Sequence, residues 1–138
     1  MAKQSGIGWT TFGVEESDGT TSRDLRNDIT NFQLATPRGV QDTTGLDKSA
    51  MERILLLADL SYTLNGVFNP TAAKSHAVFR TVPSTSVERT TVTGIAGEQL
   101  TSQVLYTDYS LARAQDGSFT WSVPGVLADG TVPTWVTL

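Results

Sequence analysis

The sequence has no cysteine and a single histidine, His76, in 138 residues. Disulfide bonds, thiolate metal ligands and cysteine nucleophiles are therefore excluded, and one histidine cannot form a multi-histidine metal site. No apolar run approaches the ~20 residues that a membrane-spanning helix needs. Residues 1–12 also lack the apolar core of a secretion signal, so we expect synthesis in the cytoplasm and no membrane insertion. We predict neither a metal nor a cofactor.

Basic side chains are scarce in the last third of the chain. The net charge is −4, and residues 90–138 hold most of it because Arg113 is the only basic residue there. The acidic residues of this segment are Glu98, Asp108, Asp116 and Asp129. Proteins that bind nucleic acid normally present a basic face to the phosphates, so stable DNA binding is not expected. A surface that DNA passes without adhering is compatible with this charge.

Serine and threonine are abundant, at 33 of the 138 positions. Threonine fits a pleated strand, so this composition favours β-structure. Asp116-Gly117 is expected to form a hairpin turn, and residues 131–138 are expected to dock as a strand or an arm. Alternation of apolar and polar residues between turn signals predicts strands at residues 10–16, 28–36, 60–64, 88–95, 100–114 and 118–123.

The segment before the clearest strand has a different pattern. Residues 38–48 are polar and are expected to form a loop. Residues 49–52 match the spacing of a helix capping box, so we predict a short helical turn there. The apolar run at 54–57 is equally compatible with the start of a strand, and we expect the turn to pass into one.

Asn69-Pro70 is a helix-start signal, and apolar residues at helical spacing continue up to Pro83. This predicts one α-helix near residues 70–82. A length of 138 residues fits one domain, so the chain is predicted to be a single domain over residues 1–138. Its fold class is mainly β, a sandwich or barrel of about six to eight strands with one flanking α-helix.

No convergent catalytic group is evident. Histidine is the side chain best suited to acid–base chemistry near neutral pH, but His76 shares a helical stripe with Ala72 and Phe79, which favours packing against the sheet. Adjacent Glu15 and Glu16 would point to opposite faces of a strand, and no glycine-rich segment has the ending and following helix of a phosphate loop. We predict no catalytic residue and no enzymatic activity.

The predicted strand at 118–123 carries its apolar residues on one side and small hydroxyl residues on the other. Trp121 lies on the apolar side and is expected in the core. Trp9 and Trp135 lie near the termini, where burial in the chain's own core and burial against a second subunit are equally compatible with the pattern. No catalytic group is evident in the sequence near the hydroxyl side of this strand.

Four segments occur in a particular order. An Asp-Ile-Thr segment (28–30) precedes SAMER (49–53), then DLSYTLNGVFN (59–69) leads into the predicted helix, and the closing hairpin ends in GSFTWSVPG (117–125). This order of parts, from about residue 27 onwards, resembles the tail tube (major tail) proteins of long-tailed bacteriophages.

The resemblance implies a β-sandwich flanked by a helix. It implies that six copies close into a ring whose inner wall is a continuous β-barrel, with strands shared across subunit boundaries. Rings would stack into the tube through which the genome leaves the capsid, so the expected location is the virion tail. The expected partners are further copies of the chain, with tape-measure and tail terminator proteins as candidates and DNA passing without specific binding.

Under this interpretation, two kinds of site residue are predicted. Acidic side chains on the tube wall would repel phosphates, and the lumen-facing candidates are Glu98 and Asp108. The loop at 38–48 and a possible N-terminal arm at 1–12 are the candidates for stacking. The predicted contacts between subunits are Trp9, Phe12, Arg38, Asp42, Asp47 and Trp135.

Three other interpretations stay open. Within the same class, the chain is compatible with another tail part or a secretion-tube ring protein of related fold. A small carbohydrate-binding sandwich would use Trp9 or Trp135 as its platform. A hydrolase would need His76 together with a carboxylate.

Overall fold

The structure is a computed structural model that describes residues 3–138. A 3-10 turn, η1 (Gly6–Gly8), precedes the first strand, and the α-helix is α1 (Ser75–Phe79). No helix of the described residues is long and apolar enough to cross a membrane. The strands are β1 (Trp9–Glu15), β2 (Ser22–Asp24), β3 (Ile29–Ala35), β4 (Arg38–Asp42), β5 (Arg53–Ala58), β6 (Ser61–Val67), β7 (Arg89–Ile95), β8 (Glu98–Tyr106), β9 (Ser110–Arg113), β10 (Phe119–Leu127) and β11 (Trp135–Thr137).

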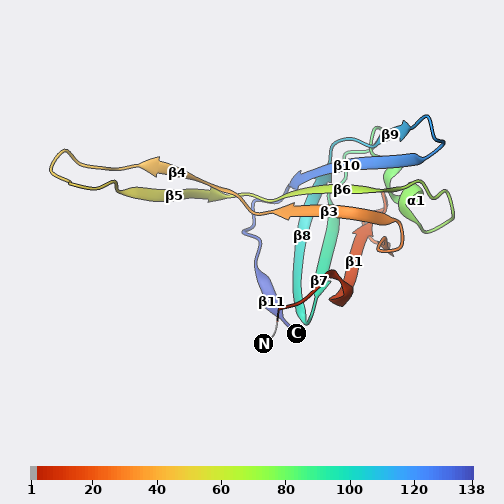
Figure 1. Cartoon of the computed structure of the whole chain (residues 1–138), viewed down its shortest axis with the longest axis horizontal. Coiled ribbons are helices and arrows are strands. Elements are labelled where there is room, and N and C mark those ends of the chain that lie inside the picture. Colours follow the sequence, from red (N-terminus) through yellow and green to blue (C-terminus); the bar gives the residue numbers. More distant parts are fainter. Residues whose placement is uncertain (1–2) are drawn as a thin grey trace.

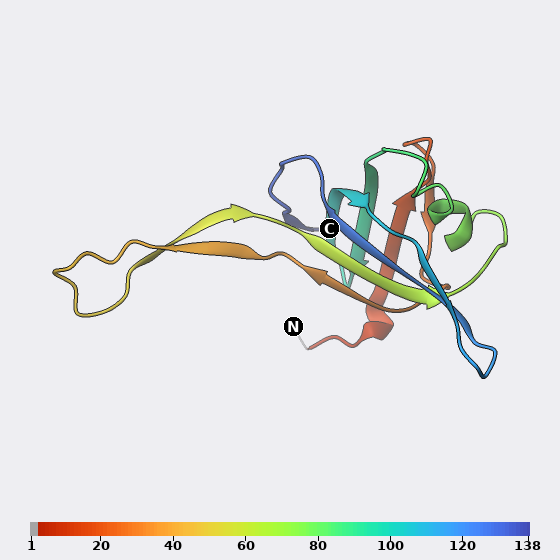
Figure 2. The ribbon, with the colours of Figure 1, turned by 90° about the horizontal axis from the view of Figure 1, so that it is seen from above.

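Nine strands form one antiparallel sheet that folds over on itself (Figures 1 and 2). We call β2, β1, β7, β8 and β11 the β8 half, and β9, β10, β6 and β3 the β10 half. The halves are joined where residues 125–127 of β10 pair with residues 104–106 of β8. Figure 2 shows the strands of one half crossing those of the other. A Cβ at Gly125 would lie 2.7 Å from Val104 Cγ1, so glycine permits this close approach at the bend.

The core lies between the two halves. Phe12 of β1 meets Tyr62 of β6 edge to face, with ring centroids 5.9 Å apart, and the Tyr62 hydroxyl lies 2.7 Å from Thr93 Oγ1. This hydrogen bond satisfies a phenol that would otherwise be costly to bury. The buried apolar residues are Phe12, Val14, Leu25, Leu60, Tyr62, Leu64, Val78, Phe79, Leu100, Val104, Tyr106, Trp121 and Val123.

The predicted fold class is confirmed: the chain is mainly β with one helix beside the sheet. Within residues 3–138 the strands number eleven, more than the six to eight predicted, partly because short β2 and β11 carry little periodic signal. The predicted strand at 100–114 divides into β8 and β9. The hairpin at Asp116-Gly117 is observed, with Ala114 N–H donating to the Ser118 carbonyl over 2.9 Å.

The helix is shorter than the predicted 70–82, because the backbone leaves the helical conformation at Ala73. Asn69, the expected cap, uses both ends of its side-chain amide. Its amide donates to Asp28 Oδ1 over 2.8 Å and its oxygen accepts from Thr71 N–H. Ala73 then has a φ of 67°, which interrupts any helix. Ser75 N–H donates to Asp28 Oδ2 over 2.9 Å, so a distant carboxylate fixes the helix start.

Residues 38–58 form a hairpin that projects from the domain (Figure 1), which we call the arm. Two predictions were wrong here: residues 38–42 are strand β4, and residues 49–52 contain no helical turn. The hydroxyl of Thr44 accepts from Glu52 N–H over 2.8 Å and Thr43 N–H donates to the Glu52 carbonyl. These bonds draw Glu52 into the hairpin turn, so the capping-box spacing is not used. The expected strand near 54–57 is confirmed as β5.

Candidate functional site

The outward side of the β10 half is an exposed sheet surface made of neutral side chains, which we call the polar face. The strand register aligns Asn31, Asn65, Ser122 and Ser110 in one row across all four strands. The other rows are Gln33, Thr63 and Pro124; Ala35, Ser61 and Val126; and Val67, Thr120 and Ala112. Eight of these thirteen side chains carry a hydroxyl or an amide, five are apolar, and none of them is charged.

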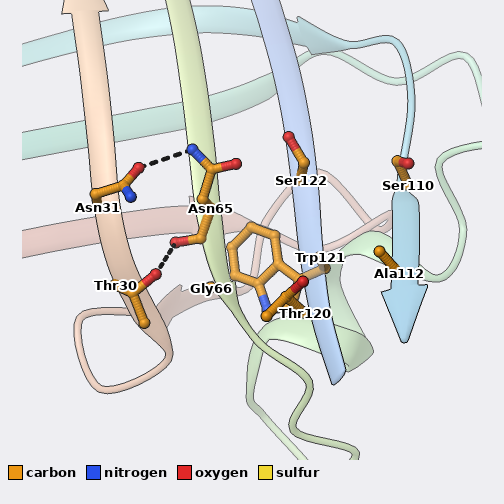
Figure 3. A pocket seen from close by; sticks show the side chains of 9 residues that line it. All are labelled: Thr30, Asn31, Asn65, Gly66, Ser110, Ala112, Thr120, Trp121 and Ser122. Carbon is orange, nitrogen blue, oxygen red and sulfur yellow. Dashed lines mark hydrogen bonds between the residues drawn. The ribbon is translucent and has the colours of Figure 1, made fainter. Parts of the chain in front are cut away.

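The polar face is hollowed around Gly66 (Figure 3). Asn65 donates to Asn31 Oδ1 over 2.7 Å, and the Thr30 hydroxyl donates to the Asn65 carbonyl over 3.2 Å. Thr30 is the extra residue of a β-bulge, because the register between β3 and β6 shifts there. The hollow has a volume of about 440 Å³ and is open to solvent.

The floor of the hollow is the indole of Trp121. This side chain is 2% exposed, and its Nε1 donates to the Val67 carbonyl over 3.0 Å. A Cβ at Gly66 would lie 2.6 Å from the indole, so only glycine allows the ring to pass beneath β6. The indole is covered, and the hollow therefore offers no open aromatic surface for stacking a sugar or a base.

The β10 half has two edges without a strand partner among the described residues. β9 pairs only with β10, and β3 pairs only with β6. Since every pairing in this half is antiparallel, β9 and β3 run in opposite directions. Open edges of this kind are templates for pairing with another chain.

The arm carries apolar side chains on both of its faces. In the register of β4 with β5, Val40 pairs with Leu55 on one face and Gln41 pairs with Ile54 on the other. Leu57 is 92% exposed. Strands that are apolar on both faces are typical of burial on both sides. The domain approaches the arm only through Val132 near its base, and Leu55, Leu56 and Leu57 stay exposed.

A second apolar region lies at the C-terminal end. β11 pairs with the start of β8, and Leu138 N–H donates to the Gly97 carbonyl over 2.8 Å. Trp135 is 46% exposed, so its ring is available for a contact with a second subunit. Val132, Val136 and Leu138 are also exposed and line a shallow groove beside it.

The other two aromatic candidates pack within the chain. Phe12 is 1% exposed and belongs to the core, so its predicted place at a subunit contact was wrong. Trp9 is half-buried and stacks on Phe32 with ring centroids 4.8 Å apart. β1 already begins at Trp9 and pairs with β7. The side of β1 that carries Trp9 and Phe12 therefore faces the core. The predicted arm at 1–12 is thus part of the sheet from Trp9 onwards, and residues 1–2 lie outside the described residues.

The three charged interface candidates lie in the arm and have local partners. Arg38 Nε donates to the Leu56 carbonyl over 2.9 Å. Hydrogen bonds from the Thr44 hydroxyl and backbone N–H hold the pKa of Asp42 below its ordinary value. Asp47 Oδ2 lies 3.9 Å from Lys48 Nζ. All three are exposed, so their predicted role in stacking stays a prediction.

Glu98 and Asp108 lie outside the polar face. Glu98 begins β8 and accepts from the Thr137 hydroxyl over 2.8 Å. Asp108 follows the other end of β8 and lines a small pocket together with Arg80 and Tyr109. The structure therefore does not bring the two carboxylates together, and their lumen-facing position stays a prediction.

His76 is half-buried beside aromatic rings. Its Nδ1 lies 3.1 Å from the Tyr109 hydroxyl, and its ring centroid lies 4.9 Å from that of Phe68. Burial raises the pKa of Tyr109. Within residues 3–138 no group of three or more histidine, aspartate or glutamate side chains is arranged to hold a metal ion.

Sequence reasoning identified only one strand of the polar face. The hydroxyl side of 118–123 was recognised from its alternation. The row that joins Asn31, Asn65 and Ser110 to Ser122 was missed, because it depends on the register between strands that are distant in the sequence.

Comparison with known proteins establishes the fold. No family model and no curated protein matches the chain. A chain of a structure described as the virion of a native gene transfer agent particle superposes with a TM-score of 0.76 at 13% identity, covering 98% of this chain and 100% of that one. A chain of the tail of an empty gene transfer agent particle, computed with C6 symmetry, gives a TM-score of 0.73 at 13% identity over 99% of both chains. At this identity the likeness concerns the fold alone.

Proposed function

We propose that this chain is a structural subunit of a virion tail, which assembles with copies of itself into rings and stacks the rings into a tube for DNA. The observation that carries the proposal is the polar face, a wet sheet surface bounded by two open edges. The structural neighbours support it, since their structures are described as a virion and a tail, the latter with C6 symmetry.

Ring closure would join β9 of one copy to β3 of the next. The two edges run in opposite directions, so the seam is an antiparallel pair like the pairs within the subunit. Pairing removes both open edges at once and continues the sheet around the ring. The polar faces then form one inner wall, with the β8 half outside it.

Stacking would use the arm. Its apolar side chains on β5, among them Leu55 and Leu57, are exposed in the single subunit. Burying them against another copy stabilises the assembly, and a strand that is apolar on both faces needs cover on both. The exposed ring of Trp135 is a further contact in this proposal. The tape-measure and terminator partners stay predictions.

A tube wall requires no catalytic group, and the proposal includes no enzymatic activity. His76 packs against Phe68 and Tyr109, which gives it a structural role without chemistry. A carbohydrate platform at Trp9 is disfavoured because Phe32 covers that ring.

Thiol accessibility tests which face lies inside. The sequence has no cysteine, so Thr120→Cys on the polar face and Ser22→Cys on the outward side of β2 each introduce one thiol at an exposed position. In assembled tubes we expect a small maleimide to label both variants. A maleimide on a large polyethylene glycol should label Ser22→Cys alone, and both variants when the protein is dispersed.

Three outcomes would contradict the proposal. Absence of rings or tubes at any concentration under electron microscopy removes the assembly. Equal labelling of Thr120→Cys by the large reagent in tubes removes the polar face from the wall. Selective protection of Ser22→Cys would put the opposite side of the molecule inside.

A further inference from the structure

The polar face is uncharged over its whole area. Charged residues make up 17% of the chain, so thirteen positions drawn at random would hold about two of them. Exposed sheet faces of soluble domains normally carry lysine and glutamate. The nearest charges of the four strands lie outside these rows. Arg38 and Asp59 flank one end of the sheet, Arg113 and Asp116 flank the other, and Asp108 precedes β9 by two residues.

The composition of the face also argues against its being covered by protein. The centre of a protein interface is enriched in aromatic and apolar side chains. Here the longest row consists of Asn31, Asn65, Ser122 and Ser110, all of which hydrogen-bond to water readily. A face that is both uncharged and mainly hydrophilic suits a molecule that keeps its hydration shell and slides along the face without being held.

We infer that the polar face is a charge-free wall for a hydrated polyanion: duplex DNA passes along it without binding to fixed cations and without repulsion by fixed anions. This inference rests on the proposed function and deepens it. Under it the wall consists mainly of hydroxyls and amides, and the predicted lumen-facing position of Glu98 and Asp108, which lie outside the polar face, would be wrong.

The physical consequence concerns salt. Duplex DNA carries one charge per ~1.7 Å, and a surface that neutralises phosphates binds it with a log–log salt slope of about −0.9 per phosphate. An acidic wall excludes DNA at low salt and admits it as screening increases, which gives a positive slope. A charge-free wall gives a slope near zero. The sign of one slope thus separates the three kinds of wall.

The experiment measures how much of a short fluorescent duplex co-sediments with assembled tubes between low and high NaCl concentration, corrected for trapped volume with neutral dextran. For the wild-type tubes we expect no dependence on salt. Thr120→Lys tubes should retain nuclease-protected duplex with a slope of about −0.9 or steeper. The matched control Ser22→Lys should bind duplex only in a nuclease-sensitive manner, and Thr120→Glu should give a positive slope.

A clear negative or positive slope for wild-type tubes would overturn the inference, because it would reveal fixed cations or fixed anions at the wall. So would Thr120→Lys tubes that retain no protected duplex although the thiol experiment places residue 120 inside. Failure of the proposed function looks different, since the tubes then do not form or Thr120→Cys is open to the large reagent.

Discussion

The arm allows a sharp separation of assembly from folding. Leu57→Ala removes three carbons from a side chain that is 92% exposed in the single subunit. At about 0.8 kcal/mol per buried CH₂, and counting only the exposed fraction, each contact between copies loses about 2 kcal/mol. That loss raises the concentration needed for assembly roughly 30-fold. The free energy of unfolding of the dispersed protein should change little, because Leu57 is not buried against other residues of the same chain.

The matched control is Leu64→Ala, the same truncation on β6, the strand that follows β5. Leu64 is 0% exposed, so its truncation should lower the free energy of unfolding by about 2–5 kcal/mol. Light scattering over a concentration series measures assembly, and urea unfolding of dispersed protein measures stability. The reasoning is refuted if Leu57→Ala assembles at the wild-type concentration, or if it destabilises the dispersed protein as much as Leu64→Ala does.

Two further predictions concern the single subunit. Gly66→Ala brings a methyl group against the Asp28 carbonyl and within 2.6 Å of the Trp121 indole, so urea unfolding should show a loss of about 1–3 kcal/mol; an unchanged midpoint would show that the strand relaxes freely. Burial raises the pKa of both Tyr62 and Tyr106, whereas in the unfolded chain both ionise near pH ~10. Stability from these groups is complete below that pH and is lost above it, by up to ~1.4 kcal/mol per pH unit for each; full tyrosinate absorbance near pH 10 in the folded protein would contradict this.

Local periodicity was a reliable guide to strands that contribute to the core. The alternation around Trp121 predicted both the strand and its buried side, because a period of two fixes the face of every residue once one is known. The strand β6 followed from the same pattern. For these elements the sequence carries the signal because burial itself creates it.

The arm and the helix start lacked such a signal. β4 is exposed along its whole length and is held by its pairing with β5 and not by the core, so its residues read as a polar loop. Asn69 makes the hydrogen bond of a cap by accepting from Thr71 N–H. The helix nevertheless starts only at Ser75, where Asp28, 47 residues earlier, accepts from Ser75 N–H. The neutrality of the polar face was missed for a related reason, since its rows combine residues from four strands.

The number of strands in the β10 half has a geometric consequence. Four is even, so the first and last strands point opposite ways. In the proposed ring, every joint between rotated copies would therefore repeat the antiparallel joints inside each copy. An odd number would force one parallel junction per copy, with a different hydrogen-bond pattern. The same antiparallel junction would serve a ring of five, six or seven copies. The curvature of the sheet and the contacts of the arm would then determine the circumference of the proposed ring, and the pairing between neighbouring backbones would stay the same.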